Sequence, residues 1–181
     1  TLFRSDGLAM YTGGEARLWR PLCNPRDLQF SAFIDDNPKG FGLLQRARAF
    51  DNFQDAEARY DKRPSAWVTP RGKWDKGSIS LVEIPVTNEF NDNIISFWSP
   101  AAPLKAGQRH DFAYDLTWSQ SGPEFSGRAR ISGTRSGAAV NNPELFTFTI
   151  DFTMPEGSTP LDPDTLKLST NASVGEISGA H

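Results

Sequence analysis

The sequence predicts an all-β protein, and three observations support that fold class. The 181 residues include 15 Gly and 13 Pro, which divide a chain into short strands joined by tight turns. The 13 Phe and 5 Trp favour the pleated surface of a sheet. Several segments alternate apolar and polar side chains with a period of two, the spacing of a strand with one buried face. Only residues 42–63 show partly helical spacing, and the broken pattern there predicts a strand or short helix leading into a loop.

Two segments carry the clearest alternation, and each predicts a half-buried strand of an antiparallel sheet. Residues 110–118 place four apolar side chains on one face: Phe112, Tyr114, Leu116 and Trp118. Residues 146–153, "FTFTIDFT", do the same with Phe146, Phe148, Ile150 and Phe152. Shorter apolar runs bounded by turn residues predict further strands at residues 16–22, 28–33, 78–85 and 93–98.

A change of composition after Trp118 predicts a domain boundary. The stretch that follows is rich in Ser, Gly, Asn and Pro, as expected of a connection between domains. We therefore expect one domain at residues 1–120 and the start of a second at 121–181, with the boundary near 119–126. From Arg128 onward the chain has room for two or three strands, which are too few for an independent sandwich.

Composition argues against several classes of function. No apolar run is long enough to span a bilayer, so membrane insertion is not expected. The 19 Lys and Arg are scattered among 22 Asp and Glu, and the net charge of -3 argues against nucleic acid as a partner. The lone Cys23 cannot form an intramolecular disulfide and is expected to be a small core residue. With 2 His and 1 Cys, no metal cluster or organic cofactor is implied.

Carboxylates and aromatic rings are the remaining candidates for chemistry. Sugar rings stack on aromatic side chains, and their hydroxyls need fixed polar partners. Glycoside hydrolysis requires two carboxyl groups, one protonated and one ionised. Glu89 and Asp92 lie three apart in "TNEFNDN", residues 87–93, between two predicted strands, and a pair of neighbouring carboxylates is a common way to keep one of them protonated. The alternative is that they only keep the loop soluble.

Other candidates each have a functional and a structural interpretation. Asp6 precedes a glycine, where a short carboxylate commonly caps a turn. The segment 35–42 sets Phe41 between two glycines, which suits either a rigid loop or ligand contact. Residues 60–74 alternate basic and aromatic residues that could stack on sugars or enter the core. The candidate substrate-binding residues are Trp67, Trp74, Phe41, Arg63 and Tyr60.

Four strings in order add a family resemblance: "SDGLAMYTGGEARLWRPLCNP", "DDNPKGFGLLQRARAF", "YDKRPSAWVTPRGKWDKGSISLVEIP" and "NDNIISFWSPAAPLKAGQRHDFAYDLTW". From about Leu2 to Trp118 the chain resembles the periplasmic glucan biosynthesis proteins G and D. The resemblance implies a β-sandwich of the galactose-mutarotase type, of which residues 1–120 are the C-terminal part, followed by the start of an immunoglobulin-like β domain. It also implies a periplasmic location and a role in making osmoregulated glucans.

The resemblance further implies an inverting β-1,2-glucanase whose partner is β-1,2-linked glucan. By motif, Asp92 of "NDN" matches the general acid, Asp6 of "SDGL" the base, and Glu89 a supporting acidic residue. Asp6 and Asp92 lie 86 positions apart and would have to meet at one cleft. Two positions depart from the family pattern, the apolar start "TLFR" and Cys23, each where a more polar sequence is expected.

Two alternatives to hydrolysis remain open from the sequence. The first is a non-catalytic glucan-binding or scaffolding protein that guides the polymer, and the second is an inactive fragment. The sequence makes no prediction of endo or exo action, glucan chain length or oligomeric state.

Overall fold

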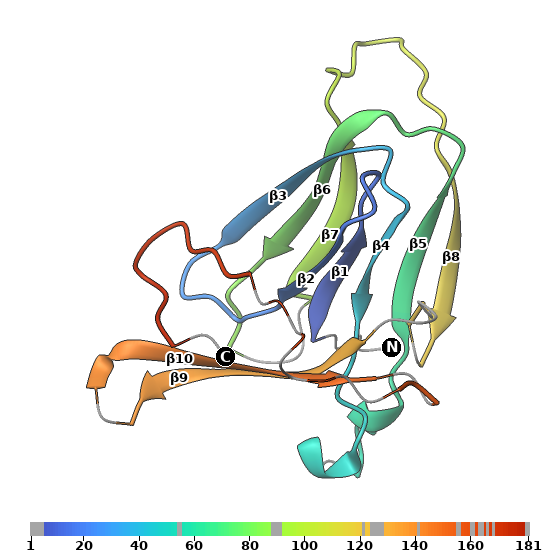
Figure 1. Ribbon diagram of the computed structural model, residues 1–181. Helices are drawn as coiled ribbons and strands as arrows, with labels where there is room; N and C mark the ends of the chain where they lie inside the picture. The colour runs from blue at the N-terminus through green and yellow to red at the C-terminus, as the bar shows by residue number, and fades with distance from the viewer. Residues whose placement is uncertain are drawn as a thin grey trace.

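The computed structural model describes residues 6–53, 56–87, 92–120, 122–123, 129–140, 142–154, 157–159, 162, 165, 167 and 169–179. Within these residues lie ten β-strands and two short 3-10 helices (Figure 1). None of the helices in the described part is long and apolar enough to cross a membrane. The all-β prediction is confirmed.

The strands form three antiparallel sheets. A five-stranded sheet has the order β2-β1-β4-β5-β8 and consists of β1 (Gly7–Tyr11), β2 (Arg17–Pro21), β4 (Gly40–Leu44), β5 (Ser65–Arg71) and β8 (Ala113–Ser119). A three-stranded sheet has the order β3-β6-β7 and consists of β3 (Gln29–Asp36), β6 (Lys76–Glu83) and β7 (Ile94–Pro100). A two-stranded sheet pairs β9 (Arg130–Ala139) with β10 (Asn142–Thr153).

The five-stranded and three-stranded sheets pack as the two layers of a sandwich, with the main core between them (Figure 1). Leu8 and Met10 of β1 and Phe41 of β4 meet Ile79 and Leu81 of β6, and all five side chains are buried. Because successive side chains of a strand point to opposite faces, Ala9 and Tyr11 of β1 face away from this core. They belong to a second cluster on the outer face of the five-stranded sheet, with Trp19, Leu44 and Trp67.

Most predicted strands are confirmed, and the exceptions are informative. The segment 42–63 contains the end of β4 and two 3-10 helices, Phe50–Asn52 and Tyr60–Lys62. β1 was not predicted because both of its faces are buried, which removes the alternation. β5 was not predicted because Pro70 interrupts it. The division of the chain into domains 1–120 and 121–181 stays a prediction.

The prediction that the strands at 110–118 and 146–153 are half-buried is wrong. Phe112, Tyr114, Leu116 and Trp118 are 42–57% exposed, and the apolar face of β10 is 48–70% exposed. β8 is the edge of a five-stranded sheet, and the facing sheet has three strands, so its apolar face stays largely exposed, although Tyr114 packs edge-on against the core residue Trp74. The prediction for Cys23 is also wrong, since its side chain is exposed just beyond the end of β2.

Candidate functional site

Strand register places Asp6 and Asp92 at the same end of the sandwich, which we call the carboxylate end. Asp6 directly precedes β1, whose first residue, Gly7, pairs with Pro21 at the end of β2 and with Leu44 at the end of β4. In the facing sheet, the last residue of β6, Glu83, pairs with the first residue of β7, Ile94. Asp92 lies two positions before Ile94 and is exposed.

The connection between β4 and β5 belongs to the carboxylate end, because β4 ends and β5 begins there. Figure 1 shows this connection, with its two 3-10 helices, at the lower end of the sandwich. The carboxylate end therefore gathers segments from both sheets and from widely separated parts of the chain.

Four hydrogen bonds fix the position of Asp6. One carboxylate oxygen, Oδ2, accepts hydrogen bonds from the backbone N–H groups of Arg46 at 2.6 Å and Ala47 at 2.7 Å. The backbone N–H of Asp6 donates to the Leu44 carbonyl at 2.8 Å, and its carbonyl accepts from the Leu22 N–H at 2.9 Å. Among the described residues, none donates a hydrogen bond to the other oxygen, Oδ1. One oxygen of this half-buried carboxylate is thus anchored and the other is available.

Two arginines of the segment after β4 lie beside Asp6. The Arg46 guanidinium carbon stands 3.3 Å from the centroid of the Trp19 ring, a cation–π contact. Burial lowers the pKa of Arg46 to about 10, and the charge of Asp6 opposes part of that shift. Burial also lowers the pKa of Arg48, again opposed by Asp6. The surroundings of Asp6 therefore carry positive charge that is only partly hydrated.

Polar contacts attach the predicted residues Tyr60 and Arg63 to this end. The Gln45 amide nitrogen donates to the Tyr60 carbonyl, and the Gln45 backbone N–H donates to Ser65 Oγ at 3.0 Å. Arg48 donates to the Arg63 carbonyl and, at 3.1 Å, to Ser65 Oγ. The Arg63 guanidinium lies 4.0 Å from the centroid of the buried Tyr60 ring. Both residues are therefore held close to the segment that anchors Asp6.

Small residues let indole rings lie flat on the outer face of the five-stranded sheet. Trp19, Ala9, Gly42 and Trp67 are paired in one row across four adjacent strands. A side chain at Gly7 would meet the Trp19 ring at 2.2 Å, and one at Gly40 would meet the Trp67 ring at 2.5 Å. The predicted Trp67 is buried against the sheet, whereas Trp19 is half-buried. The predicted contact of Trp67 with sugar stays a prediction.

The predicted residues Trp74 and Phe41 lie in the core between the sheets. Trp74 packs edge-on against Phe41, Phe112 and Tyr114, with ring centroids 5.5–6.4 Å apart. Its backbone N–H donates to Asn37 Oδ1 at 3.1 Å, in the turn after β3 at the end of the sandwich away from Asp6. The structure brings neither side chain to the carboxylate end.

Asp92 and Glu89 lie in the connection between β6 and β7. Its base is closed by a hydrogen bond of 2.8 Å from the Ile84 N–H to the Asn93 carbonyl. The prediction for Glu89 falls outside the described residues. That Asp6 and Asp92 share one cleft also stays a prediction, now supported by their place at the same end of the sandwich.

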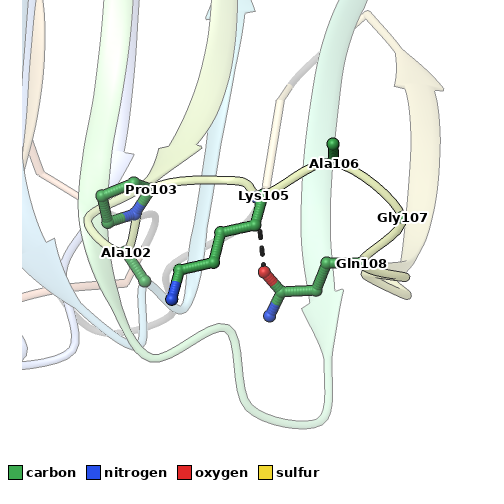
Figure 2. Close-up of a pocket in the computed structure, with 6 residues that line it drawn as sticks. All are labelled: Ala102, Pro103, Lys105, Ala106, Gly107 and Gln108. Atoms are coloured by element: carbon green, nitrogen blue, oxygen red, sulfur yellow. Dashed lines mark hydrogen bonds between the residues drawn. The ribbon is translucent and has the colours of Figure 1, made fainter.

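A hollow at the opposite end of the sandwich lacks the groups that sugar hydrolysis needs. Figure 2 shows its lining in the β7–β8 loop: Ala102, Pro103, Lys105, Ala106, Gly107 and Gln108. A hydrogen bond of 3.4 Å from the Lys105 N–H to Gln108 Oε1 braces the loop. This lining contains no carboxylate and no aromatic ring. The described residues also include no group of three or more His, Cys, Asp or Glu arranged to hold a metal ion.

Comparison with known proteins identifies the family. The sequence profile of the family described as "Periplasmic glucan biosynthesis protein, MdoG" matches residues 1–181. The chain belongs to this family. The resemblance is therefore confirmed, and the periplasmic location that it implied agrees with the family's description.

Three relatives from this family illustrate the similarity. Glucans biosynthesis protein G of Rhodopseudomonas palustris is 51% identical over 142 residues, covering 78% of this chain and 28% of the relative. Probable glucans biosynthesis protein D of Shewanella oneidensis is 53% identical over 133 residues, covering 74% of this chain and 25% of the relative. Glucans biosynthesis protein G of Vibrio cholerae is 45% identical over 173 residues, covering 94% of this chain and 31% of the relative. The chain thus spans between a quarter and a third of the length of these relatives.

In this member of the periplasmic glucan biosynthesis family, the structure identifies candidate site residues that the sequence analysis missed. Trp19 and Arg46 stack beside the anchored Asp6, although no motif marks either of them. The glycine-rich spacing of β1 and β4 was the available signal, because small residues on one face of two paired strands leave room for flat rings. Glu83, a charged residue directly after the apolar pair Leu81 and Val82 at the end of β6, was a second signal.

Proposed function

We propose that this chain carries the catalytic carboxylates of an inverting β-1,2-glucan hydrolase of the periplasm. Membership of the glucan biosynthesis family supports glucan as the substrate class. The observation that carries the reaction type is the strand register, which brings Asp6 and Asp92 to one end of the sandwich from opposite sheets. An inverting mechanism uses two carboxyl groups about 6.5–9.5 Å apart, with room between them for the attacking water.

The two carboxylates differ in a way that suits different roles. Asp92 is exposed, so it can protonate the leaving glycosidic oxygen directly or through a hydroxyl or water. Asp6 is held through Oδ2 by two backbone N–H groups, which leaves Oδ1 to accept a proton from water. Water then bonds to the anomeric carbon as the C–O bond to the leaving sugar breaks, and the anomer inverts. Glu89 would support Asp92 from the same loop.

The outer face of the five-stranded sheet is the proposed path for the polymer. It carries the half-buried Trp19 beside Arg46 and continues to the half-buried Arg63 at the carboxylate end. Aromatic rings can stack on sugar C–H faces, while guanidinium groups donate hydrogen bonds to hydroxyls. The predicted roles of Trp67, Trp74, Phe41 and Tyr60 would require movement, because all four side chains are buried.

One observation favours the alternative of a non-catalytic glucan-binding or scaffolding protein. The two backbone hydrogen bonds to Asp6 Oδ2 also fasten the start of β1 to the segment after β4. Asp6 would then be needed for the fold alone, and the carboxylate end would bind glucan without turnover.

Product analysis distinguishes the two functions. The parent chain, Asp92→Asn and Asp6→Asn are incubated with linear β-1,2-glucan, and products are separated by chromatography. Asp111→Asn is the matched control, because Asp111 lies in an exposed ion pair with Arg109 in the loop at the opposite end. We expect shorter oligosaccharides from the parent and Asp111→Asn, and at least a 100-fold loss from Asp92→Asn. Binding without products from a folded parent would support the scaffold instead.

A further inference from the structure

Three consecutive residues after β2 join the two carboxylate-bearing segments, and we call Leu22–Asn24 the strap. The Leu22 N–H donates to the Asp6 carbonyl at 2.9 Å. The Cys23 N–H donates to Glu83 Oε1 at 2.8 Å. Asn24 makes a two-way contact with Val86: its Nδ2 donates to the Val86 carbonyl at 2.8 Å, and its Oδ1 accepts from the Val86 N–H at 3.1 Å. The strap therefore contacts the start of β1 and the end of β6 at once.

A buried ion pair holds the middle of this arrangement. Glu83 is fully buried, and its Oε2 accepts a hydrogen bond from the Arg20 guanidinium at 2.7 Å. Removing an ionised carboxylate from water costs free energy, so a fully buried carboxylate must be paired and hydrogen-bonded in a defined geometry. Arg20 lies in β2 of the five-stranded sheet, Cys23 follows β2 by two residues, and Glu83 ends β6 of the three-stranded sheet. The pair thus fixes one sheet against the other at the carboxylate end.

The loop that bears Asp92 begins next to the strap and the buried ion pair. Val86, held by Asn24, lies three residues after Glu83 and six before Asp92. The opposite side of the loop is closed by the bond from Ile84 to Asn93. Both ends of the loop are therefore fixed, one of them to the strap that also holds the backbone of Asp6.

We propose that Asn24 and Glu83 are positioning residues that set the separation between Asp92 and Asp6. The inference rests on the proposed hydrolase function. The Glu83–Arg20 pair aligns the two sheets, and the Asn24–Val86 contact sets the direction in which the loop leaves β6. Neither side chain needs to touch substrate. A displacement of about 1 Å of one catalytic carboxylate lowers turnover by about 100-fold, while the groups that bind substrate stay in place.

Asn24 provides the cleaner test because its side chain is exposed. Hydrogen bonds at an exposed site compete with water, so Asn24→Ala should leave the fold intact. Asn37→Gly is the matched control at the opposite end, where Asn37 Oδ1 accepts from the N–H groups of Trp74 and Asp75. Glycine tolerates the φ of 55° found at that position. Asn24→Asp keeps the acceptor for the Val86 N–H but loses the donor.

The measurements are steady-state kinetics on β-1,2-glucan and amide hydrogen exchange of residues 84–93. For Asn24→Ala we expect kcat to fall about 10- to 100-fold, KM to stay within about 3-fold, and exchange in 84–93 to rise. Asn24→Asp should lie between Asn24→Ala and the parent. Asn37→Gly should keep the parent's kcat and its exchange in 84–93, whatever its effect on the melting temperature.

The outcomes separate the two proposals. An active parent whose Asn24→Ala variant keeps its kcat overturns the positioning role alone. A folded parent that releases no products overturns the hydrolase and the catalytic role of the strap with it. Equal loss of kcat in Asn24→Ala and Asn37→Gly would also overturn the inference, because the effect would then reflect general destabilisation.

Discussion

The centre of the sandwich and the margin of the molecule are built from similar apolar sequences but have different surroundings. At the centre, Leu8, Ile79 and Leu81 are at most 1% exposed, between two facing sheets. By the margin we mean the edge strand β8 and the separate two-stranded sheet of β9 and β10. There Trp118 of β8 is 57% exposed and Phe148 of β10 is 69% exposed. The difference shows that alternation specifies a one-sided strand, whereas burial depends on the width of the layer that faces it.

The first way to test this comparison is to remove one large apolar side chain from each region. Leu81→Ala should lower the free energy of unfolding by about 2–5 kcal/mol, because it leaves a cavity between the two sheets. Phe148→Ala should cost less than about 1 kcal/mol, because its side chain is already largely hydrated. Denaturant unfolding of both variants measures the difference. Similar losses would mean that the margin is packed as tightly as the centre.

A second test uses glycines in the two regions. A side chain at Gly42 in β4 would meet the Ala66 carbonyl oxygen at 2.1 Å, whereas one at Gly137 in β9 would meet nothing within 4 Å. Gly42→Ala should therefore destabilise by about 1–3 kcal/mol through overpacking. Gly137→Ala should be neutral or stabilising by less than about 1 kcal/mol, because it restricts the unfolded chain. Thermal melts check both, and a neutral Gly42→Ala would contradict the close contact of β4 and β5.

The smallest effect is expected where the margin joins the centre. Arg71 of β5 pairs with Asp115 of β8 at 2.6 Å, and both side chains are largely exposed. Exposed ion pairs are screened by water and salt, so Arg71→Ala should not shift the melting temperature measurably. Melts at low and high salt provide the check. A large, salt-dependent drop would show that this pair holds β8 to the sheet.

The sequence predicted those parts of the fold that depend on local pattern. The alternation from Phe112 to Trp118 predicted β8, and turn residues located β3 and β6, although the predicted bounds 28–33 and 78–85 differ by one to three residues from the observed Gln29–Asp36 and Lys76–Glu83. It could not predict that the apolar face of the edge strand β8 stays largely exposed, because sheet order and width are set by pairings between distant strands. β1 lacked the expected alternation because Leu8 and Ala9 are both buried, one in each cluster.

The candidate site depended more on resemblance and register than on composition. Asp6 and Asp92 were predicted by motif, and only the pairing of β1 and β7 with their neighbours supports their convergence. The stacking of Arg46 on Trp19 and the contact of Asn24 with Val86 join residues 27 and 62 positions apart. Contacts of this kind arise from tertiary structure, so no local pattern reveals them.

The pairing of β3 with β6 has a consequence for how the protein folds. Gln29 pairs with Glu83, 54 positions later, while β4 and β5 between them enter the other sheet. Closing so long a stretch of chain is entropically costly, and such non-local pairings slow folding. The contacts of Glu83 with Arg20 and Cys23 span a similar interval. We therefore expect the carboxylate end to be completed late, so that a newly exported chain gains its strap only after the sandwich has closed.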